Sequence, residues 1–199
     1  VAQLVLLDSN FSALPRVVSE GRRVINNIER VASLFLAKTV YSLILSLLTG
    51  VFALAYPLQP IHLTILSWLT IGTPAFFMAL EPNDQRVEEG FLQRVLGHAI
   101  PAGMVIAAQT MIVFSIVQID AGISEDEAKS IAVLVAGSVA LMNLYRTAMP
   151  LNTLRRVLVV TMTALFAGAF LLPSTRRVFD LPVVNEVWAY GLAAAFIVL

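Results

Sequence analysis

The chain has 199 residues, of which 58% are hydrophobic and 13% are charged, and its formal net charge is zero. Soluble domains carry about twice this share of charged residues, so the composition excludes a soluble enzyme domain and favours a protein that crosses a membrane several times. The balanced charge gives no indication of a nucleic-acid partner. Because the chain has no cysteine, disulfides and thiolate metal ligands are excluded as well.

The first 30 residues combine a short apolar segment with a charged helix. Residues 1–7 have the pattern of a buried strand, and Pro15 is typical of the first turn of a helix. The charged segment 19–30 then continues into apolar sequence without an interruption. We therefore expect residues 1–30 to be a strand–helix unit of a Rossmann-like domain, whose helix is a stalk that enters a membrane domain over residues 31–199.

Apolar segments long enough to cross a bilayer follow one another through the rest of the chain. A spanning helix needs about 20 mostly apolar residues. This criterion predicts an all-α bundle of six transmembrane helices, the last of which is truncated. Because Val1 is not a start methionine, we expect the chain to be part of a longer protein. The predicted spans are residues 31–56, 58–80, 95–119, 128–149, 157–173 and 182–199.

Lysine and arginine are distributed unevenly between the two sides of the predicted bundle. If the first span starts in the cytoplasm, nine arginines lie on the cytoplasmic side, whereas only Lys129, Arg176 and Arg177 lie on the other. Positive residues accumulate in cytoplasmic loops. We therefore expect a multi-pass protein of the cell membrane with its N-terminus in the cytoplasm. The nine are Arg16, Arg22, Arg23, Arg30, Arg86, Arg94, Arg146, Arg155 and Arg156.

Hydroxyl side chains form a stripe along the first predicted span. Thr39, Ser42, Ser46 and Thr49 have the spacing i, i+3, i+7 and i+10, which places them on one face of a helix. Such hydroxyls can also bond to carbonyls of their own helix or pack against a neighbour. We interpret the stripe as a polar path for ions. Lys38, an ionisable residue inside this span, either extends to the cytoplasmic surface or supplies a counter-charge to an ion site.

The second predicted span contains a proline and a glycine near its middle. Pro74 lacks an N–H and its ring crowds the carbonyl of Thr70, while Gly72 adds backbone freedom. The helix should therefore open within residues 70–74, and Ser67 adds an oxygen nearby. Discontinuous helices occur at the ion sites of transporters, although an ordinary proline kink would have the same pattern.

Two stretches of the sequence resemble P-type cation-transporting ATPases. The first comprises Val5-Leu-Leu-Asp-Ser-Asn-Phe-Ser12, Glu20-Gly-Arg-Arg23 and Asn26-Asn27, and is similar to the end of the phosphorylation domain and the stalk of the fifth transmembrane helix. The second comprises Ile71-Gly-Thr-Pro-Ala75 and Glu81-Pro-Asn-Asp84, and is similar to the sixth helix and the loop after it. Residues 24–35 most resemble the actinobacterial cation-transporting ATPase E type. The six spans would then be helices five to ten of the family.

The resemblance implies a pump in which ATP and Mg²⁺ act on an aspartate outside this chain, so no catalytic or nucleotide-binding residue is expected here. It implies three partners: the lipid bilayer, a transported cation and the N-terminal remainder of the same protein. It also implies calcium as the leading cation, although the mid-membrane carboxylates of calcium and sodium–potassium pumps are absent. The implied ion-path residues are Thr39, Ser42, Ser67, Thr70, Ile71 and Asn143, and the implied gating residues are Lys38, Gly72 and Pro74.

Two other functions are open on the sequence alone. A secondary transporter or membrane scaffold would have no need of the strand and charged stalk, and a secondary carrier usually has a mid-membrane Asp or Glu, which this sequence lacks. We also find no clear internal repeat, which many such carriers show. A lipid-translocating member of the same superfamily would keep the stalk but would need a different cavity.

Overall fold

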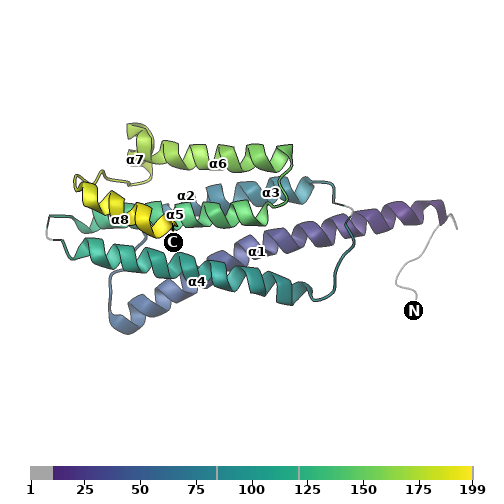
Figure 1. Ribbon diagram of the computed structural model, residues 1–199, viewed down its shortest axis with the longest axis horizontal. Helices are drawn as coiled ribbons and strands as arrows, with labels where there is room; N and C mark the ends of the chain where they lie inside the picture. Colours follow the sequence, from purple (N-terminus) through teal and green to yellow (C-terminus); the bar gives the residue numbers. More distant parts are fainter. Residues whose placement is uncertain (1–10, 84, 121, 199) are drawn as a thin grey trace.

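The computed structural model describes residues 11–83, 85–120 and 122–198, which form helices joined by short connections (Figure 1). Among these described residues there is no strand, and the strand predicted for residues 1–7 lies outside them. Five helical segments are long and apolar enough to cross a membrane. They are Leu14–Phe52, Pro60–Leu80, Phe91–Gln118, Glu125–Thr147 and Thr153–Leu171.

The first of these helices, α1 (Leu14–Phe52), is 39 residues long. It follows a short 3-10 turn, Phe11–Ala13, and Pro15 lies in its first turn as the sequence predicts. The helix passes through residue 30 without a break, so the stalk and the first span are one rigid element. Its N-terminal part extends beyond the other helices (Figure 1).

Most of the remaining helices pack against α5 (Glu125–Thr147), which has the most buried span. It begins with a capping box, in which the Ser124 hydroxyl accepts a hydrogen bond from the Glu127 N–H while the Glu127 carboxylate accepts one from the Ser124 N–H. Its neighbours include α4 (Phe91–Gln118) and α6 (Thr153–Leu171).

Helices α1 and α4 approach each other closely at Gly103. A Cβ atom at this position would lie 2.5 Å from Cβ of Val40 and 2.9 Å from the carbonyl oxygen of Ala37. Only glycine therefore allows the two backbones to pack at this distance. Figure 1 shows α1 crossing α4 obliquely, so that the C-terminal end of α1 turns away from the bundle.

The last apolar segment is helical over a shorter range than the truncated sixth span predicted for residues 182–199. A short helix, α7 (Pro173–Val178), precedes it, and α8 begins only at Val187 and ends at Val198, a length of 12 residues. Residues 181–186 are not helical, and Leu181 and Val184 are buried there. The Val184 N–H donates to the Tyr190 hydroxyl at 3.2 Å. Part of this apolar run thus packs against the bundle without helical structure.

Candidate ion path and stalk junction

The second membrane helix is irregular at the place where the sequence predicts an opening. Between α2 (Pro60–Ser67) and α3 (Thr73–Leu80), the residues Trp68–Gly72 form a π-helical turn. The Thr73 N–H bonds to the carbonyl of Trp68, five residues back. Pro74 falls in the first turn of α3, where a missing N–H is tolerated. The chain therefore widens within an unbroken helix instead of unwinding, and such turns are frequent at functional sites.

The polar residues of this turn are directed toward their own helix. Thr70 is buried and its hydroxyl donates to the carbonyl of Leu66 at 2.7 Å. The Ser67 hydroxyl donates to the carbonyl of Leu63 in the same way. Because each hydroxyl donates its proton, its oxygen lone pairs stay free to accept or to coordinate a cation. Ile71 is also buried and can offer only its backbone carbonyl.

Three of the four residues of the α1 hydroxyl stripe line an open groove of about 530 Å³. Lys38, Thr39 and Ser42 face this groove together with Ser46, and every residue that lines it belongs to α1. The Thr39 hydroxyl donates to the carbonyl of Phe35 at 3.2 Å. Within the described part of the chain, no hydrogen bond joins the stripe to the π-helical turn. The stripe therefore faces away from the rest of this bundle.

Asn143 lies apart from the other predicted ion-path residues. It is half-buried in a second cavity between α4, α5 and α8. The structure thus brings Lys38, Thr39 and Ser42 together on one face, places Ser67, Thr70 and Ile71 at the π-helical turn, and separates both groups from Asn143. No cluster of three or more His, Asp or Glu side chains suited to a metal occurs among residues 11–83, 85–120 and 122–198.

The stalk is fastened to the end of α3 by Asn27. The Asn27 side chain is 2% exposed, and its amide nitrogen donates to the carbonyls of Ala79 at 3.1 Å and Glu81 at 2.7 Å. The last carbonyls of a helix have no partner within the helix. Asn27 supplies partners to two carbonyls at this end, so the α3 terminus is attached to the side of α1.

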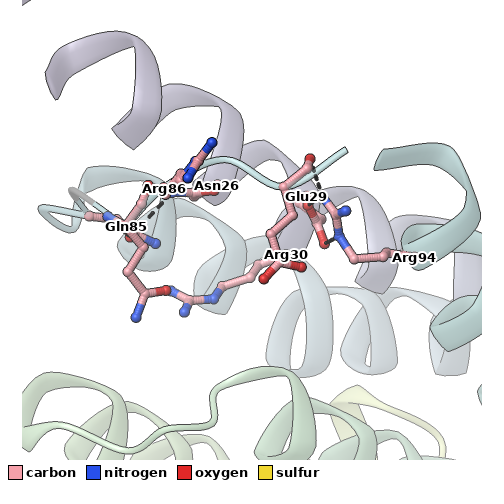
Figure 2. A pocket seen from close by; sticks show the side chains of 8 residues that line it. Asn26, Glu29, Arg30, Gln85, Arg86 and Arg94 are labelled. Carbon is pink, nitrogen blue, oxygen red and sulfur yellow. Dashed lines mark hydrogen bonds and ion pairs between the residues drawn. The ribbon is translucent and has the colours of Figure 1, made fainter. Parts of the chain in front are cut away.

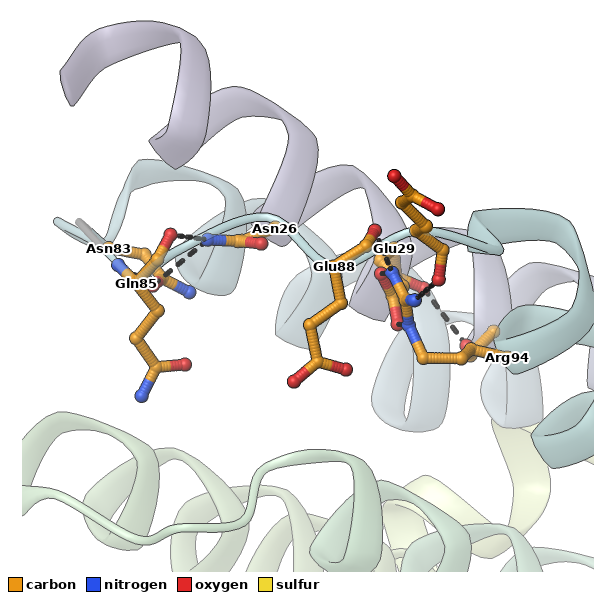
Figure 3. Close-up of polar contacts among 8 residues, drawn as sticks. Asn26, Glu29, Asn83, Gln85, Glu88 and Arg94 are labelled. Carbon is orange, nitrogen blue, oxygen red and sulfur yellow. Dashed lines mark hydrogen bonds and ion pairs between the residues drawn. The ribbon is translucent and has the colours of Figure 1, made fainter. Parts of the chain in front are cut away.

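Asn26 and Glu29 of α1 make further contacts with the loop after α3 and with the start of α4. The Asn26 amide donates to the carbonyl of Gln85 at 2.8 Å. Glu29 accepts two hydrogen bonds from the Arg94 guanidinium, both at 2.8 Å, and Arg94 also donates to the carbonyls of Glu88 and Glu89 (Figure 3). Bidentate pairs of this kind fix orientation as well as distance. The contacts surround a polar pocket of about 230 Å³ between the stalk and the loop (Figure 2).

A buried ion pair joins α3 to α6. Nε of Arg155 lies 2.6 Å from Oε2 of Glu81, and both side chains are almost fully buried. Asn152 donates to the other carboxylate oxygen of Glu81. Arg155 also donates to the carbonyl of Pro150 at 2.8 Å and to that of Ala148, just after α5. One arginine thus connects the ends of α3 and α5 with the start of α6.

The sequence alone does not indicate this junction. Arg94 and Arg155 have the pattern of positive charges in loops, and Asn26 and Asn27 belong to the stretch that resembles the family. The partners lie 52 to 74 residues away along the chain. A signal was nevertheless present, because Glu81 directly follows a membrane helix, where a lone carboxylate requires a cationic partner.

Comparison with known proteins places the chain among ion-pumping ATPases. It is 37% identical to the calcium-transporting ATPase CtpE of Mycolicibacterium smegmatis, with all of this chain and 27% of the relative covered. It is 41% identical to CtpE of Mycobacterium tuberculosis, with 93% and 25% covered. It is 31% identical to the probable cation-transporting ATPase exp7 of Streptococcus pneumoniae, with 94% and 25% covered.

The chain thus spans about a quarter of the length of the curated relatives it matches. No family profile matches it. The similarity extends over the stalk, the π-helical turn and the later helices, since the alignments cover nearly all of the chain. The chain belongs to the P-type cation-transporting ATPases.

Proposed function

We propose that this chain is the membrane translocation part of an ATP-driven pump that transports calcium. The observation that carries the proposal is the attachment of one continuous helix, α1, to the end of the irregular second helix through Asn27. The names of the relatives support it, since two of those compared are called calcium-transporting ATPases. The aspartate that the resemblance implies is phosphorylated belongs to an Asp-Lys-Thr-Gly motif, and this chain contains no such sequence. ATP and Mg²⁺ therefore act in the remainder of the protein, which is the main partner of this chain besides the bilayer.

In this proposal the stalk enters the membrane from the cytoplasm and moves when the remainder of the protein is phosphorylated. Asn27 ties the stalk to the end of α3, and Glu29 ties it through Arg94 to the loop after α3, so α3 follows the motion of α1. The π-helical turn at Trp68–Gly72 lies between α3 and α2, and it deforms when α3 moves relative to α2. Ion access on the two sides of this turn then alternates, with Gly72 and Pro74 as the residues that allow the change.

Oxygen atoms supply the proposed coordination. Hard cations such as calcium take six to eight oxygen ligands. Thr70, Ser67 and the Ile71 carbonyl offer oxygens at the turn, and Thr39 and Ser42 offer them along the α1 groove. The α1 groove faces away from this bundle, so we propose that the remainder of the protein covers it and adds carboxylates, with Lys38 balancing their charge. Asn143 would then serve a separate, accessory position.

The test is ATP-dependent uptake of radioactive calcium by vesicles that contain the complete protein. Thr70→Val keeps the shape of the side chain but removes the oxygen, and we expect the calcium concentration for half-maximal uptake to rise about tenfold or more. Thr163→Val is the matched control, because Thr163 is exposed on α6 and its hydroxyl also bonds four residues back.

Each outcome of this test has a defined meaning. Unchanged calcium affinity in Thr70→Val would remove the π-helical turn from the ion path. ATP-dependent uptake of another cation, without calcium, would refute the assignment of the ion but keep the pump. ATP-dependent movement of labelled lipid with no cation uptake would instead identify a lipid-translocating member of the superfamily.

A further inference from the structure

His62 joins the start of the second membrane helix to a distant part of the chain. It lies in the first turn of α2 and is 0% exposed. Nδ1 of its imidazole accepts a hydrogen bond from the Gln59 N–H at 3.1 Å, and Nε2 lies 3.0 Å from the carbonyl oxygen of Asp180. The side chain of Gln59 also donates to Asp126, at the start of α5, at 3.1 Å. The start of α2 is therefore fastened both to α5 and to the connection between α7 and α8.

The backbone at Asp180 is fixed by the way in which α7 ends. Asp180 has a φ of 51°, in the left-handed region, and the Leu181 N–H bonds back to the carbonyl of Arg176 at 2.9 Å. A left-handed residue with a bond of this kind commonly terminates a helix, and aspartate tolerates the conformation better than most residues. Leu181 is buried directly after it. The carbonyl that faces His62 is thus held in place by the chain on both sides.

The two contacts of the imidazole determine where its proton lies. A backbone N–H can only donate and a backbone carbonyl can only accept, so Nδ1 is bare and Nε2 carries the hydrogen. A second proton, on Nδ1, would point at the Gln59 N–H and break that contact. The charged side chains that face His62 are Asp126 and Lys129 of α5 and Asp180, but both ring nitrogens are occupied by backbone groups. The junction therefore requires a neutral histidine.

We propose that neutral His62 is a positioning residue for transport, because it holds α2 in place while α3 moves. Asn27 attaches the end of α3 to the stalk, and the π-helical turn at Trp68–Gly72 lies between the two attachments. His62 lies at the end of the bundle away from the N-terminal part of α1 (Figure 1). Motion of the stalk is thereby concentrated at the turn. This inference rests on the proposed function, since it concerns the same moving helix.

The first measurement is nitrogen NMR of the complete protein in detergent, labelled with ¹⁵N-histidine. The ring signals of His62 are those that disappear in His62→Gln. At about pH 7.5 we expect the pattern of an imidazole that carries its proton on Nε2 alone. A ring protonated on Nδ1 alone, or on both nitrogens, would overturn the assignment of the junction.

The second measurement is the unfolding of the complete protein by denaturant between about pH 7.5 and pH 5.5. A histidine of the unfolded chain binds a proton below about pH 6.5, whereas the junction requires the neutral ring, so stability rises with pH. The ratio of folded to unfolded protein should fall by up to about tenfold per pH unit below about 6.5, relative to His62→Gln. Glutamine can still donate to Asp180 but does not titrate. His98→Gln is the matched control, because His98 is exposed on α4. If His62→Gln and His98→Gln show the same pH dependence, the proposal fails.

The third measurement is the maximal rate of ATP-driven calcium uptake at about pH 7.5. His62→Phe keeps a planar ring but removes both contacts, so the rate should fall about fivefold or more, while the calcium concentration for half-maximal uptake stays the same. His62→Gln, which keeps the contact with Asp180, should retain more of the rate. Equal rates in His62→Phe and His98→Phe would overturn the positioning role.

A failure of this inference can be distinguished from a failure of the proposed function. Thr70→Val tests calcium affinity, whereas His62→Phe tests the maximal rate. The NMR and unfolding measurements involve no calcium at all. If Thr70→Val leaves the affinity unchanged while the His62 variants behave as expected, the ion path is wrong and the junction at α2 stands.

Discussion

Replacing Arg155 with methionine would leave the Glu81 carboxylate buried without its cationic partner. The two side chains are 7% and 6% exposed, so water cannot take over the role of the guanidinium. Removing one partner of a buried ion pair costs about 3–5 kcal/mol of stability. Arg155 also donates to the carbonyls of Ala148 and Pro150, and these acceptors would lose a partner as well. The amide of Asn152 would remain bonded to Glu81, so we expect a loss of about 3 kcal/mol.

The measurement is the free energy of unfolding of the complete protein in mixed micelles, followed by denaturant titration. Arg156→Met is the control for loss of a neighbouring arginine that is exposed, and we expect it to change stability by less than about 0.5 kcal/mol. The double variant Glu81→Gln with Arg155→Met removes both charges. It should recover more than half of the loss, because the carboxylate that Arg155 neutralises is removed with it, and Arg30, which also interacts with Glu81, keeps Glu29 as a partner.

The reasoning would be refuted by either of two results. If Arg155→Met costs no more than Arg156→Met, then water reaches Glu81 and the pair is not buried in the protein. If the double variant is as unstable as the sum of the two single variants, then Glu81 and Arg155 do not interact energetically. In that case the hydrogen bonds of Arg155 to the α5 end would account for its effect.

Three further predictions concern the helix contacts. Asn27→Ala should cost about 1–3 kcal/mol of stability, because the carbonyls of Ala79 and Glu81 lose their donor, and ATP-driven uptake should fall further than in Asn26→Ala. Pro74 lies where the π-helical turn tolerates a missing N–H, so Pro74→Ala should change the free energy of unfolding by less than about 1 kcal/mol while uptake slows; unchanged uptake would count against a functional π-helical turn. Gly103→Ala should cost about 1–3 kcal/mol, because its Cβ would meet the Ala37 carbonyl and Val40.

The control for the last prediction is Gly21→Ala. A Cβ atom at Gly21 would meet nothing within 4 Å, and this residue lies in the exposed part of α1. The substitution should stabilise the helix by about 0.5–1 kcal/mol. Thermal unfolding of both variants separates close packing from helix propensity. If Gly103→Ala and Gly21→Ala shift the unfolding temperature equally, the close contact at Gly103 has no energetic role.

Local sequence determines much of this fold. Hydropathy predicts five of the membrane helices to within a few residues at most ends, because the bilayer requires a certain apolar length. The exception is α1, which begins well before residue 31. Pro74 and Gly72 predict irregularity at the right place, because the loss of an N–H is a local effect. Local sequence did not predict that the irregularity would be a π-helical turn. Whether the backbone unwinds or forms a π-helical turn depends on the neighbouring helices that bury Thr70 and Ile71.

Contacts between distant segments could not be predicted from one sequence. The pair Glu81 and Arg155 and the amide bonds of Asn27 require knowledge of which helix ends meet. Residues 181–186 were likewise not predictable as a non-helical connection, because an apolar run fits a buried connection as well as a helix. Of the predicted ion-path residues, only neighbours on one helix are close together. Whether they bind an ion together is the subject of the transport assay proposed above.

The close contact between Gly103 and Val40 has a geometric consequence for α1. It lies about 39 Å along the helix from Leu14 but only about 18 Å from Phe52. If the helix rocks about this contact, it acts as a lever with unequal arms and Gly103 as its fulcrum. A tilt of about 5° would move the Leu14 end by about 3.4 Å and the Phe52 end by about 1.6 Å. The Phe52 end thus moves about half as far as the Leu14 end and exerts about twice the force.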